Sequence, residues 1–125
     1  MAASFAESPV TDLVRVDVVQ IGPTVRVIAS GEIDSSSSLV LESHLDGVLE
    51  NRPDELVVDL CAVTFLDSAG LCVLASAHRR AQEQQTSMRL LASSRAVARP
   101  LQITGLWQLL GAEQVEAGSG DQSVA

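Results

Sequence analysis

The sequence predicts a single α/β domain in which a mixed β-sheet is covered by helices mainly on one face. The chain has 125 residues and is 46% apolar, which suits one globular domain with a sizeable core. Its apolar segments switch between strand and helix periodicity in the order ββαβαβα. Right-handed crossovers between neighbouring parallel strands would then place the helices on a single face of the sheet.

The first half of the chain predicts a hairpin followed by a helix. Apolar and polar side chains alternate over residues 13–19 and 25–29, and the Gly-Pro turn signal between these segments indicates an antiparallel pair. Gly31-Glu32-Ile33-Asp34 is interpreted as a short polar exit from the sheet. A serine run and an apolar stripe at helical spacing then predict a helix over about residues 36–51, which ends before Pro53.

The second half predicts parallel strands alternating with helices. We expect a buried strand over 55–60, a helix over 70–85, a strand over 88–92, a helix over about 94–103 that Pro100 should kink or interrupt, and a last short element over 106–110. The domain is therefore predicted over residues 12–110. A flexible N-terminus over 1–11 and a flexible tail over 111–125 would flank it.

Composition excludes several functions. A net charge of −8 disfavours phosphate contacts with nucleic acid, and all eight basic residues are Arg, which excludes lysine Schiff bases and P-loop lysines. Cys61 and Cys72 lack metal-ligand spacing and are interpreted as small buried hydrophobes. No signal peptide or membrane-length apolar run is visible, so we expect a cytoplasmic protein without membrane contact, cofactor or metal.

A polar pair, Asp67-Ser68, stands where the predicted strand ends and the next helix begins. Loops at the carboxyl ends of strands converge on an open α/β sheet and often carry its function. Nucleophilic catalysis is disfavoured because Leu66 replaces the first glycine of a G-x-S-x-G elbow, and the only histidines, His44 and His78, lie far from Ser68 in sequence. We therefore expect no catalytic residues.

Ser68 has two compatible interpretations. It is a helix N-cap, or Asp67 caps the helix alone and leaves the Ser68 hydroxyl free to carry a phosphate, which would change the surface and preserve the fold. Asp34 would lie beside this loop if the sheet order follows the chain. There it would either position a partner group or nucleotide, or serve only as a cap or Asx-turn residue.

The segment from Asp59 to Leu71, Asp-Leu-Cys-Ala-Val-Thr-Phe-Leu-Asp-Ser-Ala-Gly-Leu, resembles the signature of the STAS domain, shared by sulfate transporters and anti-sigma-factor antagonists. Gly31-Glu32-Ile33-Asp34 resembles a second family element, and the similarity covers about residues 12–110. The sequence departs from the family pattern at Cys61, where Ser is common, at Ala69, where the family has a second hydroxyl residue, and after Leu110, where a clear apolar helix is missing.

This resemblance implies a phosphorylation switch. In stand-alone members, an anti-sigma factor with serine kinase activity phosphorylates the serine that corresponds to Ser68. The unphosphorylated antagonist binds that anti-sigma factor and frees a sigma factor, and a PP2C-type phosphatase reverses the modification. The implied partner-binding residues are Asp34, Asp67, Ser68, Ala69, Gly70 and Leu71. The alternative is a STAS-type module that senses a nucleotide or small ligand. A homodimer is a further possible assembly that the sequence leaves undecided.

Overall fold

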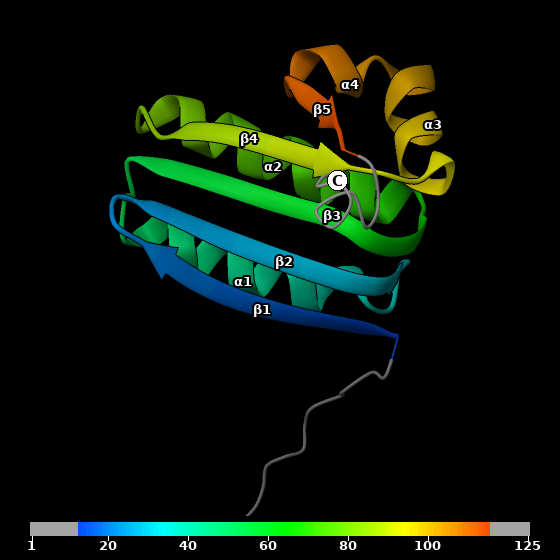
Figure 1. Cartoon of the computed structure of the whole chain (residues 1–125), viewed down its shortest axis with the longest axis horizontal. Coiled ribbons are helices and arrows are strands. Elements are labelled where there is room, and N and C mark those ends of the chain that lie inside the picture. The colour runs from blue at the N-terminus through cyan, green and yellow to red at the C-terminus, as the bar shows by residue number, and fades with distance from the viewer. Residues whose placement is uncertain (1–12, 116–125) are drawn as a thin grey trace, which may run out of the picture.

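Five strands form one mixed sheet whose order, β1-β2-β3-β4-β5, follows the chain (Figure 1). The computed structural model describes residues 13–115. β1 pairs antiparallel with β2, and every other neighbouring pair is parallel. In chain order the elements are β1 (Val14–Ile21), β2 (Thr24–Ile33), α1 (Ser38–Glu50), β3 (Glu55–Leu66), α2 (Ser68–Glu83), β4 (Ser87–Ala92), α3 (Arg95–Thr104), α4 (Leu106–Leu109) and β5 (Ala112–Gln114).

The predicted fold class is confirmed, because one core lies between the sheet and its helices. Alternate residues of each central strand point to this core, so that Val27 of β2 and Val58 of β3 are fully buried. Leucines at helical spacing, such as Leu41 and Leu45 of α1, cover them from the other side. Figure 1 shows α1 and α2 together behind the strands.

The opposite face of the sheet carries a row of charged side chains. Arg26 of β2 contacts Asp59 of β3 at 2.7 Å. Arg89 of β4 lies between two carboxylates, 3.0 Å from Glu113 of β5 and 3.8 Å from Glu55 of β3. Oppositely charged neighbours on adjacent strands stabilise the sheet modestly. Val57, which is 5% exposed, lies between Arg26 and Arg89 in the register, so this face combines the charged row with a buried apolar residue of β3.

Both β2 and β3 run further than predicted. Gly31-Glu32-Ile33, expected to leave the sheet, belongs to β2, and residues 61–66 continue β3. Two register shifts between the strands insert extra residues on the β3 side, which breaks the alternation on which the shorter prediction relied. Gly31 adopts a φ of 99°, and a Cβ there would collide with the carbonyl oxygen of Leu13. Only glycine fits that position.

The helices also differ from the prediction, most clearly at the start of α2 and at Pro100 of α3. α2 begins at Ser68, two positions before the predicted start at Gly70, since Asp67 serves as its N-cap. Pro100 does not interrupt α3, which runs unbroken to Thr104. Proline lacks a backbone N–H, so the hydrogen bond that residue 100 would donate to the carbonyl of Ala96 is missing. Ala96 is exposed, so water can hydrogen-bond to this carbonyl instead.

The prediction of a flexible tail from residue 111 is wrong for residues 112–114. These form β5, which pairs with the end of β4, and Val115 N–H donates to Ala92 O at 2.7 Å. Ala112-Glu113-Gln114 has no strand periodicity, so only its pairing partner makes it a strand. The predicted flexible segments over 1–11 and from residue 116 onward lie outside the described residues.

Candidate functional site at the ends of β2 and β3

The loops that follow β2 and β3 lie side by side. Ile33 and Leu66, the last residues of these strands, are register partners, and Asp67 N–H donates to Ile33 O at 3.2 Å. Parallel neighbours bring their carboxyl ends to the same edge of a sheet. The structure therefore brings together the Asp34 loop and the Asp67-Ser68 loop, as expected if the sheet order followed the chain.

Asp67 caps α2 and leaves the hydroxyl of Ser68 unused. The Asp67 carboxylate accepts hydrogen bonds from Ala69 N–H at 2.9 Å and Gly70 N–H at 3.4 Å. Ser68 is the exposed first residue of the helix, and its Oγ forms no hydrogen bond with any residue of the described range 13–115. Of the two sequence-based interpretations, the one in which Asp67 caps the helix alone matches the contacts.

Gly70 holds the first turn of α2 against the strand ends. It is buried, and a Cβ at this position would overlap the side chain of Leu66 and come within 2.8 Å of Ile33 Cγ2. Leu71 follows as a buried residue, and its N–H donates to Asp67 O at 3.0 Å. Gly70 and Leu71 thus belong to the interior of the site, while Ser68 is its exposed point.

Asp34 forms a tight turn with the serines that follow it. Its carboxylate accepts hydrogen bonds from Ser36 N–H at 2.9 Å, Ser36 Oγ at 2.8 Å and Ser37 N–H at 3.0 Å. The Ser36 hydroxyl, followed by the Ser37 amide, lowers the pKa of Asp34 below its ordinary value. The Asx-turn alternative is therefore present. The half-buried carboxylate stands at the same edge as Ser68.

The serines of this loop differ in their environment. Ser37 is fully buried, and its hydroxyl donates to Glu32 O at 2.7 Å while it accepts from Asp34 N–H at 2.9 Å. Ser35 and Ser36 are exposed. Since Ser36 already bonds Asp34, the free and exposed hydroxyl of Ser68 differs from it in both geometry and availability.

The structure gives the histidines and cysteines no catalytic arrangement. His44 Nδ1 lies 2.8 Å from Val40 O within α1, and among residues 13–115 no cluster of His, Cys, Asp or Glu could hold a metal ion. Burial, followed by the hydrogen bond with Asp59, raises the pKa of Cys61 to about 11. The expectation that both cysteines are buried is wrong for Cys72, which is exposed on α2.

An apolar groove beside the site was missed by sequence reasoning. It is a shallow, open hollow of about 440 Å³ between the end of β3 and α3, and it is lined by Phe65, Leu66, Arg95, Ala96, Arg99, Pro100 and Ile103. Phe65 and Ile103 are exposed large apolar residues. The spacing of Arg95, Arg99 and Ile103, each one helical turn apart, was the sequence signal that they share a face.

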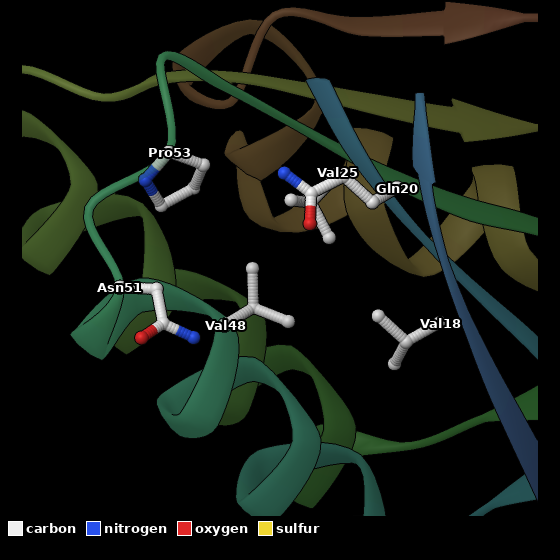
Figure 2. A pocket seen from close by; sticks show the side chains of 6 residues that line it. All are labelled: Val18, Gln20, Val25, Val48, Asn51 and Pro53. Carbon is white, nitrogen blue, oxygen red and sulfur yellow. The ribbon is translucent and has the colours of Figure 1, made fainter. Parts of the chain in front are cut away.

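A second pocket lies at the other end of the sheet. Figure 2 shows Val18, Gln20 and Val25 of the hairpin opposite Val48 of α1 and Asn51, the residue that follows this helix, with Pro53 closing one side. The pocket has a volume of about 380 Å³. Val25 stands near the beginning of β2 and Pro53 precedes β3, whereas Ser68 follows the end of β3. This pocket is therefore separate from the Ser68 loop.

The family model of the STAS domain matches residues 15–117, and the chain belongs to this family. It is 36% identical over 76 residues to the anti-sigma-F factor antagonist RsfB of Mycobacterium tuberculosis, an alignment spanning 61% of this chain and 62% of that relative. It is 33% identical to the anti-sigma-B factor antagonist of Bacillus subtilis, over 78% of this chain and 88% of that protein. The crystal structure of an anti-sigma factor antagonist from Mycobacterium paratuberculosis superposes with a TM-score of 0.77 at 32% identity, covering 84% and 87% of the two chains.

Proposed function

We propose that this protein is an anti-sigma-factor antagonist, a regulatory binding protein and not an enzyme. Its relatives carry that name, and the site offers an exposed hydroxyl near the carboxylates of Asp34 and Asp67, with no cluster of His, Cys, Asp or Glu among residues 13–115 that could hold a metal ion. The observation that carries the proposal is the exposed Ser68 hydroxyl at the start of α2. This hydroxyl is not needed as a helix cap, because the Asp67 side chain caps α2.

In the proposed cycle, the unphosphorylated protein binds an anti-sigma factor that is also a serine kinase, and so releases a sigma factor. The binding surface comprises the exposed Ser68 with Asp34, Asp67 and Ala69 around it, supported from below by Gly70 and Leu71. Phosphorylation of Ser68 ends the complex, and a PP2C-type phosphatase restores the binding form. The cycle takes place in the cytoplasm. The structure contains no helix, within residues 13–115, long and apolar enough to cross a membrane.

The electrostatics of the site explain how phosphate would act. A phosphoserine adds a charge of roughly −1.5 to −2 at neutral pH. Asp67 already occupies the Ala69 and Gly70 amides, so the phosphate cannot take these donors without displacing a carboxylate. It would instead concentrate negative charge beside Asp67 and Asp34. Because Ser68 has no packing role, the surface changes and the core does not.

The direct test incubates the protein with ATP and candidate anti-sigma kinases and maps the phosphate by mass spectrometry. We expect a single phosphate on Ser68. Ser68→Ala should abolish its incorporation, whereas Ser35→Ala and Ser36→Ala, which alter exposed serines of the neighbouring loop, should leave it unchanged. Phosphate on another residue, or none with any kinase that binds the protein, would contradict the proposed switch.

A second candidate function, sensing of a small ligand, is favoured by the pocket in Figure 2. Its polar lining consists of the amide side chains of Gln20 and Asn51, and no basic residue lines it. A nucleotide phosphate would find no cation there, so an uncharged ligand fits better than ATP or GTP. Isothermal titration with ATP and GTP tests this preference: the lining predicts no binding of either nucleotide, and tight binding of one would contradict the assignment of an uncharged ligand to this pocket.

A further inference from the structure

β1 forms a long and unprotected edge of the sheet. It lies at the opposite side of the sheet from β5 in Figure 1, and within residues 13–115 no strand pairs with its outer side. In an antiparallel pair, half of the backbone N–H and C=O groups of a strand point away from its partner. Proteins usually protect such edges by shortness, charged side chains, proline or a bulge, and of these β1 has only the charges of Arg15 and Asp17. β5 has three residues, but β1 has eight, without proline and without a register shift against β2.

The side chains of this edge are mostly apolar and exposed. Val18 and Val19, which point to opposite faces of the sheet, are 45% and 41% exposed, and Ile21 is 58% exposed. Figure 2 shows Val18 at the rim of the pocket between the hairpin and α1. The only charged residues of the strand are Arg15 and Asp17. An apolar edge with free backbone groups is a template for another strand.

We propose that two copies of this chain pair antiparallel through β1, with a two-fold axis at Val16, so that their sheets become one. In such a pair, residue i of one copy faces residue j of the other with a constant sum of i and j. The axis at Val16 places Arg15 opposite Asp17 of the second copy, and Asp17 opposite its Arg15. Arg15 and Asp17 already lie 3.6 Å apart as an ion pair within one strand, and in the dimer each also faces its opposite charge on the other copy, which adds two ion pairs across the joint.

The charges select this register over its neighbours. An axis at Asp17 would place the two Asp17 carboxylates directly opposite each other, and an axis at Arg15 would do the same with the two guanidinium groups. Like charges at directly opposed positions are destabilising. An axis at Val18 would set both charged residues against apolar ones. Only the axis at Val16 pairs Arg15 with Asp17 and also covers Val18, which then faces Val14 of the second copy.

The proposed pairing leaves the Ser68 loop free. A two-fold axis perpendicular to the sheet keeps the helices of both copies on the same face. β2 and β1 lie between β3 and the joint in each copy, so the loop after β3 is not used in the pairing. The dimer is therefore independent of the proposed phosphorylation switch, and either can fail without the other.

Sedimentation or light scattering over a wide concentration range tests the proposal. The protein should reach twice its monomer mass, and Arg15→Asp and Asp17→Arg should each weaken the association constant by roughly tenfold or more, because two ion pairs become two like-charge contacts. Arg79→Asp, with the same charge change on the exposed face of α2, should dimerise as the unchanged protein does. Circular dichroism verifies that each variant is folded.

Mixing the two variants tests the register itself. Arg15→Asp carries two acidic residues on β1 and Asp17→Arg carries two basic ones, so a mixed dimer regains both ion pairs. The double variant R15D/D17R should likewise recover self-association. A protein that stays monomeric at its highest soluble concentration, a dimer that survives both single substitutions, or a mixture that fails to associate would each overturn the proposal.

Discussion

Gly70 determines how closely α2 approaches the ends of β2 and β3. The helix begins against Ile33 and Leu66, and the absence of a side chain at Gly70 allows this contact. The glycine of the sequence motif thus has a packing role, since its backbone lies outside the left-handed region. At the residue scale, the position of Ser68 depends on a neighbour that is buried and chemically inert.

Gly70→Ala should therefore destabilise the protein, by roughly 1–3 kcal/mol, because the new methyl group is forced into a packed site. The matched control is Gly47→Ala in α1, where a Cβ meets no atom within 4 Å. Replacing glycine by alanine in a helix interior stabilises by about 0.5–1 kcal/mol. Urea denaturation of both variants measures the difference, and equal effects would contradict the packing role.

The two cysteines should differ in reactivity. Cys61 is half-buried, and with a pKa of about 11 its thiol is almost entirely protonated at neutral pH, whereas Cys72 is exposed. We expect iodoacetamide to label Cys72 much faster than Cys61 in the folded protein. Peptide mapping over time measures both rates. Denaturant should remove the difference, and preferential labelling of Cys61 in the native protein would refute the assignment.

At the scale of single elements, α2 depends on its N-cap for a defined start. The carboxylate of Asp67 satisfies two amides that the helix geometry leaves unpaired. The same carboxylate contributes negative charge beside Ser68. Its structural and electrostatic contributions can be separated because asparagine retains the cap without the charge.

Asp67→Ala should cost about 1 kcal/mol of unfolding free energy through the lost cap. Asp67→Asn should cost less, since its side-chain oxygen accepts the same hydrogen bonds. Chemical denaturation distinguishes the two substitutions. If Asp67→Asn is the more destabilising of the pair, the charge and not the cap holds the start of the helix.

Ser68→Asp should keep the fold and lose binding to the anti-sigma kinase, because the exposed side chain can carry charge without disturbing the core. Ser76→Asp, an exposed position further along α2, is the matched control and should bind normally. Thermal melts followed by binding measurements make the comparison. Intact binding by Ser68→Asp would count against an electrostatic switch, and loss of its fold would indicate a structural serine.

On the scale of the whole molecule, the charged face ties the strands together across the sheet. Asp59 is nearly buried, which alone would raise its pKa, but the hydrogen bonds from Arg26 and Cys61 N–H lower it overall below the ordinary value of 3.8. A lowered folded-state pKa stabilises the protein above the unfolded-state pKa. That contribution is lost as the pH falls through the folded-state pKa.

Stability should accordingly decline on acidification below about pH 4. Asp59→Asn should cost roughly 1 kcal/mol at neutral pH, because it removes the charge that pairs with the partly exposed Arg26 while its amide oxygen can still accept one hydrogen bond, and it should reduce the acid decline. Urea titrations across a pH series measure both effects. A double-mutant cycle with Arg26→Gln isolates the pair, and a coupling energy near zero would contradict its role.

The sequence predicted elements well where local chemistry decides them. Apolar periodicity identified the strands β1 to β4 and the helices α1 to α3, and it marked residues 106–110 as a short element without assigning its type. The order of the elements placed Asp34 beside Asp67 and Ser68 once the sheet order followed the chain. It could not predict β5, because Ala112-Glu113-Gln114 becomes a strand only by pairing with β4. The groove under Phe65 was missed for a similar reason, since α3 and the end of β3 form it jointly.

By itself, the sequence determined the fold class and the position of the polar pair Asp67-Ser68 between a strand and a helix. It also determined that Ser68 carries the one hydroxyl of this pair and its successor, because residue 69 is alanine. These follow from periodicity, turn chemistry and residue type, which act within a few neighbours along the chain. Only the tertiary structure decided that Asp67 alone caps α2, that Gly70 is packed, that two bulges lengthen β3 and that β1 is left as an apolar edge. Each of these features depends on contacts between segments that are far apart in sequence. The pattern of residues within a short segment does not predict such contacts.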